Sequence, residues 1–176
     1  MSHPTLQHLA TAIRDIPDYP KTGILFKDIT PILKDPMLFS QTLDRLVERL
    51  KPYAPDYILG VEARGFIFGA TLADRLGVGF IPIRKKGKLP AETLSYSYAL
   101  EYGVDTIEMH QDAIEAEARV IILDDLLATG GTAAAAAELV KQVGANLVAY
   151  GFVIELDFLN GRELLGDVPV ESLLHF

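Results

Sequence analysis

The chain has 176 residues, of which 49% are hydrophobic, and 16 Lys or Arg against 24 Asp or Glu give a net charge of −8. This length suits one domain that buries roughly 70% of the surface of its unfolded chain, so we expect a single domain over residues 1–176. The acidic balance argues against non-specific binding to nucleic acid or to a membrane. There are no cysteines, which excludes disulfides, thiol catalysis and cysteine-ligated metals.

No apolar run is long enough to span a bilayer, and the first ten residues lack the basic region and apolar core of a signal peptide. We therefore expect a cytoplasmic protein. The sequence also contains no repeat, no linker and no sign of a second domain.

The N-terminal third predicts two helices separated by an extended arm. Apolar residues at helical spacing predict a helix over residues 4–16. Residues 23–30 form an extended or loop segment, and their pattern alone favours an N-terminal arm packed on the core. Asp35 and Pro36 suit the N-cap and the first position of the second helix, which Pro52 stops.

Two short apolar runs, Tyr57–Val61 and Gly79–Ile83, predict buried strands. The first run is followed by the loop Glu62–Gly65 and by a helix over residues 66–76. An arginine in such a loop, Arg64, can cap a neighbouring carbonyl or hold an anion, and taken alone the structural role is the commoner one.

A basic run, Arg84–Lys88, follows the second of these strands and is the densest cluster of positive charge in an acidic chain. Most such runs are solvated turns. This run also lies at a strand end, where open α/β sheets bind ligands. Residues 89–110 then suggest two strands around a turn at 101–105, which predicts a hairpin or a long flap, since long loops in compact domains are usually functional or mobile.

The most informative stretch is Val120–Thr132, which reads V-I-I-L-D-D-L-L-A-T-G-G-T. Its first four residues are typical of a strand buried on both faces of a parallel sheet. Asp124 and Asp125 place two carboxylates at the C-terminal end of that strand. The small, hydroxyl-rich loop Ala128–Thr132 then leads into a poly-alanine helix over residues 132–143.

A strand, a glycine loop and a helix N-terminus together form a phosphate site. The first N–H groups of a helix have no partner inside the helix, and the helix dipole adds partial positive charge there. Glycines let the backbone approach an anion, and threonine hydroxyls add donors. The two carboxylates would repel phosphate, so they must face sugar hydroxyls or a divalent cation. The stretch therefore predicts a sugar phosphate site, and a plain βα turn with ordinary capping residues is the alternative.

The chain ends with predicted strands over residues 146–154 and 170–174, which flank a short helical turn over 162–165. The alternation of strands and helices predicts an α/β fold with a mostly parallel central sheet flanked by helices. Other signatures are missing. The sequence has no P-loop motif, no complete dinucleotide fingerprint and no G-x-S-x-G elbow, and its four histidines are too scattered for a zinc site.

If the predicted strands are neighbours, their ends converge on one crevice. Asp124 and Asp125 suit a ribose diol there. Arg64, Lys85 and Lys88, helped by Mg²⁺, suit a diphosphate. The residue chemistry therefore points to a phosphoribosyl diphosphate site.

The central stretch resembles the phosphoribosyl-diphosphate motif of type I phosphoribosyltransferases. Further segments, together with the C-terminal S-L-L, resemble the adenine branch of that family: F-K-D-I-T-P-I-L-K-D-P (26–36), E-A-R-G-F-I-F-G (62–69), I-R-K-K-G-K-L-P (83–90) and S-Y-x-L-E-Y-G (97–103). The similarity covers nearly the whole chain, in order. It implies a type I phosphoribosyltransferase fold with a flexible β-hairpin flap and an N-terminal base-binding hood.

The resemblance implies a role for each residue of the site. The 5′-phosphate would lie on Ala128, Thr129, Gly130, Gly131 and Thr132, and the ribose hydroxyls on Asp124 and Asp125. The diphosphate would lie on Glu62, Ala63, Arg64, Arg84, Lys85 and Lys88. Adenine would lie against Leu25, Phe26, Lys27 and Leu126. Glu101 would be the acid/base residue on the flap, with Tyr102 beside it.

Several finer points also come from the resemblance. The peptide bond between Glu62 and Ala63 is often cis in the family. Lys88 would act from its own chain or from the partner subunit of a homodimer. Lys27 stands where an arginine is common, and Ala63 where some members have serine.

The implied reaction transfers the 5-phosphoribosyl group from phosphoribosyl diphosphate to adenine, giving AMP and diphosphate in purine salvage. Mg²⁺ is the implied cofactor, held mainly by substrate and water rather than by direct protein ligands. Two alternatives stay open: a transferase for another base, such as xanthine or hypoxanthine/guanine, and a regulatory protein that senses phosphoribosyl diphosphate without catalysis. The acidic charge disfavours the second, since such regulators usually carry a nucleic-acid-binding domain or a basic surface.

Overall fold

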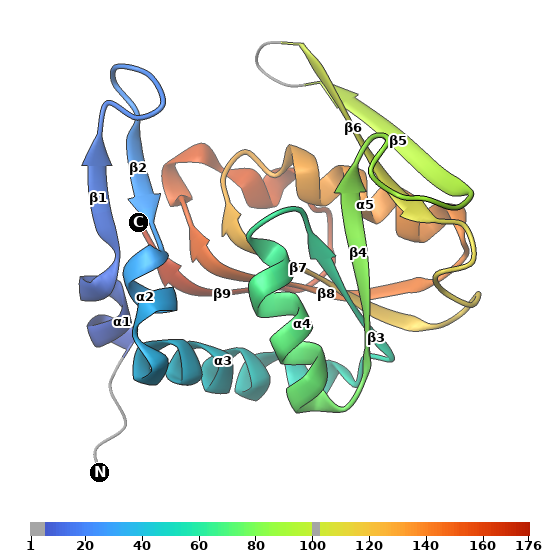
Figure 1. The fold of residues 1–176 in the computed structure, drawn as a ribbon, viewed down its shortest axis with the longest axis horizontal. Helices are drawn as coiled ribbons and strands as arrows, with labels where there is room; N and C mark the ends of the chain where they lie inside the picture. Colours follow the sequence, from blue (N-terminus) through green and yellow to red (C-terminus); the bar gives the residue numbers. More distant parts are fainter. Residues whose placement is uncertain (1–5, 100–102) are drawn as a thin grey trace. The chain divides into compact units, whose positions relative to one another are not determined.

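The computed structural model describes residues 6–99 and 103–176 (Figure 1). They form two compact units, one that ends at Arg45 and one that begins at Leu46, and each is described by itself. Helix α3 (Pro36–Leu50) runs across this boundary. No helix among the described residues is long and apolar enough to cross a membrane.

The first unit contains α1 (Leu6–Ala12), β1 (Arg14–Pro17), β2 (Leu25–Asp28), α2 (Thr30–Lys34) and the start of α3. The two strands pair antiparallel, with Arg14 opposite Asp28. Arg14 donates hydrogen bonds from Nε (2.9 Å) and Nη2 (2.5 Å) to Asp28 Oδ2. The Thr30 N–H donates to the same carboxylate. These two partners lower the pKa of the buried Asp28 carboxyl, which stays charged and ties β2 to α2.

The helix predicted over residues 4–16 is wrong after Ala12, because Arg14–Pro17 pairs with β2 instead of continuing the helix. The short helix α2 was not predicted. The predicted cap of α3 is confirmed, since the Asp35 carboxylate accepts the N–H groups of Met37 and Leu38 at 2.8 and 3.1 Å.

The second unit is built on one seven-stranded sheet. Its strands are β3 (Tyr57–Val61), β4 (Gly79–Lys85), β5 (Thr93–Ala99), β6 (Val104–His110), β7 (Arg119–Leu127), β8 (Asn146–Glu155) and β9 (Val170–His175). They are ordered β5-β6-β4-β3-β7-β8-β9. The five neighbouring strands β4, β3, β7, β8 and β9 are parallel. The hairpin of β5 and β6 is antiparallel, and its strand β6 pairs antiparallel with β4. This confirms the predicted mostly parallel α/β sheet.

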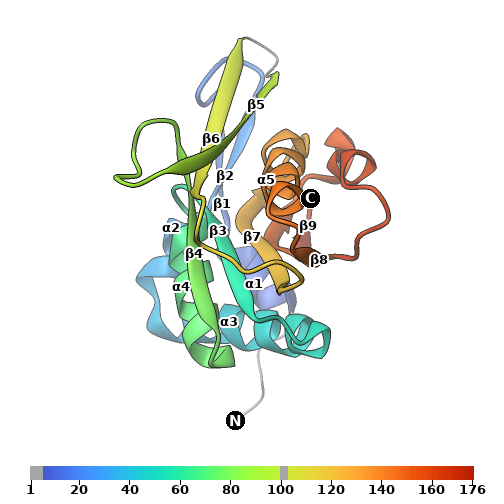
Figure 2. The ribbon, with the colours of Figure 1, turned by 90° about the vertical axis from the view of Figure 1, so that its right-hand side faces the viewer.

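Two helices flank this sheet, α4 (Gly65–Leu76) on one face and α5 (Gly131–Gln142) on the other (Figure 2). Successive strand residues point to opposite faces. In the central strand β7, Ile121 and Ile122 are therefore both fully buried. The 3₁₀ turns η1 (Lys51–Tyr53), η2 (Asp157–Leu159) and η3 (Gly161–Leu164) complete the unit.

Strand β7 is longer than predicted. The sequence placed its end at Leu123, but the strand continues through Leu127. Its pairing with β3 stops at Leu123, opposite Gly60, whereas its pairing with β8 continues to Leu127, opposite Glu155. The last residues of β7 are therefore held on the β8 side and unpaired on the β3 side, which is where the cleft begins.

The predicted hairpin is confirmed. Strands β5 and β6 pair along their whole length, with Tyr98 opposite Asp105. Strand β6 meets β4 only at the end of β4, where Arg84 and Lys85 pair with Glu108 and Ile107. The hairpin therefore begins beside the basic run and extends beyond the parallel sheet (Figure 1).

Candidate active site

The ends of β3, β4 and β7 lie side by side, as the sequence prediction required. Two adjoining hollows open at this edge of the sheet, and both include Asp124. The first is lined by Asp124, residues 126–133 and Phe152. The second is lined by Val61, Glu62, Ile83, Lys85, Tyr98, Asp105, Ile107, Asp124 and Thr132. The structure thus brings together Asp124, the glycine loop and Lys85 of the basic run, whereas Asp125 lines neither hollow.

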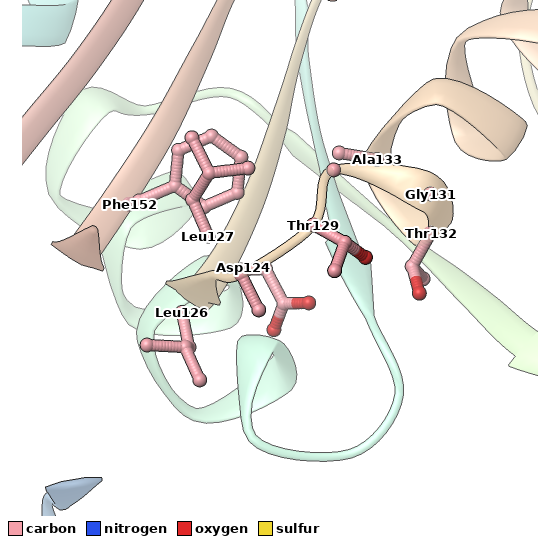
Figure 3. A pocket seen from close by; sticks show the side chains of 10 residues that line it. Asp124, Leu126, Leu127, Thr129, Gly131, Thr132, Ala133 and Phe152 are labelled. Atoms are coloured by element: carbon pink, nitrogen blue, oxygen red, sulfur yellow. The ribbon is translucent and has the colours of Figure 1, made fainter. Parts of the chain in front are cut away.

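The glycine loop wraps the first hollow (Figure 3). Gly130 adopts φ +84°, a left-handed conformation that suits glycine, and α5 starts at the next residue. The first helical bond of this turn runs from the Ala134 N–H to the Gly130 carbonyl. No side chain among the described residues caps this helix. The N–H groups of its first turn are therefore available to an anion.

The carboxyl groups of the acidic pair both have a raised pKa. Asp125 is 4% exposed, and the Arg64 Nε lies 3.0 Å from its Oδ2. This Oδ2 atom is fully buried and accepts no hydrogen bond from the described residues. Burial raises the pKa of Asp124 well above its ordinary value, and the neighbouring Asp125 charge raises it further. Burial also raises the pKa of Asp125, but the Arg64 charge opposes this.

Glu62 gathers the basic run around one carboxylate. Lys88 Nζ lies 2.6 Å from its Oε1, and the Lys85 N–H donates to its Oε2 at 3.0 Å. Arg84 Nε donates to the same Oε2 at 3.4 Å. Burial alone would raise the pKa of Glu62, but these hydrogen bonds outweigh it and lower the pKa to about 2. The peptide bond from Glu62 to Ala63 is cis, as the resemblance implied.

Two residues of the hairpin also reach the cleft, and the sequence analysis had not selected them. Asp105 accepts a hydrogen bond from Lys85 Nζ at 3.1 Å. Tyr98 contacts Thr132 through their hydroxyls at 3.0 Å and donates to Asp105 at 3.4 Å. Burial alone would raise the pKa of Asp105, but the hydrogen bonds from Lys85 and the Thr106 N–H lower it. A polar chain thus links the basic run to the first turn of α5.

The residues predicted to bind adenine belong to different units. Leu25, Phe26 and Lys27 lie on β2 in the first unit, where Lys27 Nζ pairs with Asp15 at 2.7 Å. Phe26 packs edge-on against Tyr19, with ring centroids 5.2 Å apart. Leu126 lies on β7 in the second unit and lines the first hollow. Glu101 and Tyr102 lie outside the described residues.

The carboxylates of the cleft differ in how they could face a divalent cation. Glu62 is already held by three basic residues, and Asp125 lies against Arg64. Asp124 is partly exposed and lines both hollows. Such a donor set suits Mg²⁺ bound mainly through the oxygens of a substrate and water, with Asp124 nearby, rather than a cage of protein ligands.

Comparison with known proteins identifies the fold and its chemistry. The sequence model of the phosphoribosyl transferase domain matches residues 30–158. The adenine phosphoribosyltransferase of Koribacter versatilis is 56% identical over 173 residues, which cover 98% of this chain and 95% of that protein. The chain belongs to the adenine phosphoribosyltransferase family.

Solved structures agree with this family assignment. The adenine phosphoribosyltransferase from Thermoanaerobacter pseudethanolicus matches with a TM-score of 0.95 and 53% identity, over 98% of this chain and 100% of that chain. The enzyme from Saccharomyces cerevisiae was solved with D-2,5-dideoxy-2,5-imino-altritol 1,6-bisphosphate and adenine. It matches with a TM-score of 0.91 and 51% identity, over 96% of this chain and 98% of that chain.

The raised pKa of Asp124 gives a stability prediction. The pKa of Asp124 is 3.8 in the unfolded chain and higher in the folded protein. As the pH rises from 3.8 through the folded pKa, the unfolded chain loses the proton more readily, so the folded state becomes less stable. Asp124→Asn should therefore raise Tm at pH 8 by about 2–4 °C, which corresponds to roughly 1 kcal/mol, while lowering kcat/KM. Thermal unfolding at pH 8 and pH 4 checks this. The difference should shrink towards pH 4, and a variant less stable than the native protein at pH 8 would contradict it.

Proposed function

We propose that this protein transfers the 5-phosphoribosyl group of phosphoribosyl diphosphate to adenine, giving AMP and diphosphate in purine salvage. The observation that carries the proposal is the division of one cleft into three chemically distinct parts. These parts are an uncapped helix N-terminus, a pair of carboxylates, and a cluster of basic side chains around Glu62. The yeast relative, solved with adenine and a bisphosphate, supports the choice of base and of a doubly phosphorylated sugar.

The phosphate and sugar are assigned to the β7–α5 junction. The 5′-phosphate would accept N–H groups from the first turn of α5 and hydroxyl groups from Thr129 and Thr132. Its two negative charges would be stabilised by the positive end of the helix dipole. The ribose hydroxyls would then donate to the partly exposed Asp124 and to the buried Asp125, whose Oδ2 accepts no hydrogen bond from the described residues.

The diphosphate is assigned to the other side of the cleft. Arg64, Arg84, Lys85 and Lys88 would contact its oxygens, together with the backbone of Glu62 and Ala63. Lys88 Nζ lies 2.6 Å from Glu62 Oε1 of the same chain, which supports assigning Lys88 to the diphosphate of its own subunit. In the free protein Lys85 pairs with Asp105 and Lys88 pairs with Glu62. A bound diphosphate would replace these carboxylates as the anion that the two lysines contact.

Mg²⁺ would accompany the diphosphate and offset its charge. We assign it to the oxygens of phosphoribosyl diphosphate and to water, with Asp124 as the nearest suitable carboxylate. The resemblance also implies a homodimer, which sedimentation would reveal as twice the 19.3 kDa mass of the chain.

The bond from ribose C1 to diphosphate would break as adenine N9 bonds to C1. Arg64, Lys85 and Lys88 would stabilise the negative charge that develops on the leaving diphosphate. The Leu25–Lys27 segment and Leu126 would hold the purine so that N9 faces C1. The hairpin flap would exclude water, which otherwise would hydrolyse the activated sugar. The proton that adenine loses would pass to a general base, which we assign to Glu101.

A panel of bases tests the proposed reaction. Purified protein, Mg²⁺ and phosphoribosyl diphosphate are mixed with adenine, hypoxanthine, guanine or xanthine, and nucleotide formation is followed. We expect AMP from adenine alone. Turnover of a 6-oxopurine would leave the proposed sugar-phosphate site standing but would show that adenine is the wrong base. Binding of phosphoribosyl diphosphate without turnover of any base would instead indicate a sensor.

The basic run offers a matched pair of variants. Lys88→Ala should raise KM for phosphoribosyl diphosphate by about tenfold or more, because one cation of the cluster is lost. KM for adenine should change little. Lys86→Ala is the control, since it removes an equal charge from an exposed side chain in the same run. Equal effects of the two substitutions would show that only net charge matters and would reject the assignment of Lys88.

The role of Glu101 is tested by Glu101→Gln, which keeps the size of the side chain but cannot exchange the proton. General acid/base catalysis typically contributes 10²–10⁴-fold, so kcat should fall by about that factor with the affinity for phosphoribosyl diphosphate preserved. Turnover close to that of the native protein would show that the proton leaves by another route.

A further inference from the structure

The glycine loop rests on a second stretch of backbone that no site prediction included. We define this brace as residues 157–165, which contain η2 and η3. A Cβ atom placed on Gly161 would overlap the Ala128 carbonyl oxygen and lie 3.1 Å from the Gly130 nitrogen. Conversely, a Cβ atom on Gly130 would overlap the Gly161 carbonyl oxygen. The two glycine backbones are therefore in direct contact, with no room for a side chain between them.

The brace is fixed to the sheet by an ion pair between Arg162, whose side chain is partly exposed, and the buried Glu155. Arg162, the residue after Gly161, donates from Nε to Glu155 Oε1 at 2.5 Å and from Nη2 to Glu155 Oε2 at 2.7 Å. Its Nη1 also donates to the Val170 carbonyl of β9 at 3.1 Å. Glu155 is 4% exposed and is the last residue of β8, so this bidentate pair ties the brace to a rigid strand.

The other end of the brace is anchored in the core. Leu165 is 4% exposed and belongs to the same apolar cluster as Leu139 of α5. At the start, the Leu156 N–H donates to the Leu127 carbonyl at 2.9 Å, and the Asp157 N–H donates to the Phe176 carbonyl at 2.9 Å. Gly161 is thus held between fixed points and cannot retreat from the loop without breaking one of them.

This arrangement matters because, among the described residues, the other contacts of the loop lie at its two ends, at Leu127 and at Thr132, and not at Ala128 and Gly130 where the backbone of Gly161 touches it. Its glycines are conformationally permissive, and no described side chain caps the helix that follows. Binding groups must be held within about 0.5 Å of their productive geometry to act well. A backbone surface pressed against Ala128 and Gly130 supplies that constraint from behind the hollow.

We propose that Gly161 is a positioning residue for the 5′-phosphate, held against the loop by the Glu155–Arg162 pair. The inference rests on the proposed assignment of Ala128–Thr132 to that phosphate. A side chain at Gly161 would push the Ala128 carbonyl and the Gly130 N–H away from their places. The N–H groups of the loop would then no longer converge on one anion. The diphosphate half of the cleft, built on β3 and β4, would be unaffected.

The test compares two ligands on one variant. Gly161→Ala should weaken binding of ribose 5-phosphate and of AMP by about tenfold or more in calorimetric titrations. Binding of diphosphate with Mg²⁺ should stay within about twofold of the native value. In steady-state assays KM for phosphoribosyl diphosphate should rise more than kcat falls. Arg162→Met should give a smaller loss in the same direction, and Arg162→Lys, which keeps the charge, should recover part of it.

Gly151→Ala is the matched control. A Cβ atom there would lie 2.6 Å from a Leu123 methyl group and 2.7 Å from a Leu50 methyl group, so the substitution crowds the sheet away from the loop. It should lower Tm and leave the ratio of the two affinities unchanged. The affinities of Gly161→Ala are measured well below its Tm. If this substitution weakens the binding of ribose 5-phosphate and of diphosphate equally, or weakens neither, Gly161 has only a structural role and the proposal is overturned.

The phosphate assignment itself is checked separately with Thr132→Ala. If this loop variant binds ribose 5-phosphate as tightly as the native protein does, the assignment of the loop fails. If Thr132→Ala weakens that binding and Gly161→Ala does not, the loop assignment stands and the brace proposal fails.

Discussion

Parallel pairing of β3 with β4 on one side and β7 on the other is the constraint on which the site depends. It places three strand ends at one edge of the sheet, and each end continues into residues with different chemistry. The pairing between β3 and β7 stops at Gly60 and Leu123, so the backbone that follows Leu123 turns an unpaired side towards the cleft. The acidic pair lies at that point, where the strand is paired with β8 and Arg64 lies against Asp125.

Charge balance inside the cleft follows from this geometry. An acidic chain concentrates cations at one place by giving each a carboxylate partner: Glu62 for Lys88, Asp105 for Lys85 and Asp125 for Arg64. The carboxylates are the more buried partners of these pairs, and leaving them without a cation would be costly. The negatively charged oxygens of a polyanionic substrate can take the place of these carboxylates beside the cations. The cations therefore have anionic partners both before and after the substrate binds. The carboxylate pair differs, because its repulsion is relieved only in part by Arg64.

The sequence predicted the local features of this site well and the long-range ones poorly. The strand, loop and helix of Val120–Thr132 are encoded by neighbouring residues, so their pattern was sufficient. Strand β1 was mistaken for the end of a helix because its partner, β2, lies beyond a turn that periodicity does not describe. Tyr98 and Asp105 were missed because only the hairpin register sets them opposite each other, and the alternation along both strands could have indicated it.

Gly161 was missed for a related reason. Its contact with the glycine loop joins segments about thirty residues apart, and only the absence of space for a Cβ atom reveals it. The roles of Leu25, Phe26, Lys27 and Glu101 came from resemblance to the family and not from pattern. No periodicity marks a short extended segment as a base pocket, and Glu101 lies outside the described residues.

A crystal structure with bound AMP would test the division of the cleft most directly, because AMP carries the phosphate, the ribose and the base together. The account predicts the phosphate within hydrogen-bond distance of the N–H groups of residues 129–132. It also predicts the ribose hydroxyls on Asp124 and Asp125, and the purine beside Phe26. A phosphate bound instead among Arg84, Lys85 and Lys88, with the ribose away from the acidic pair, would contradict it.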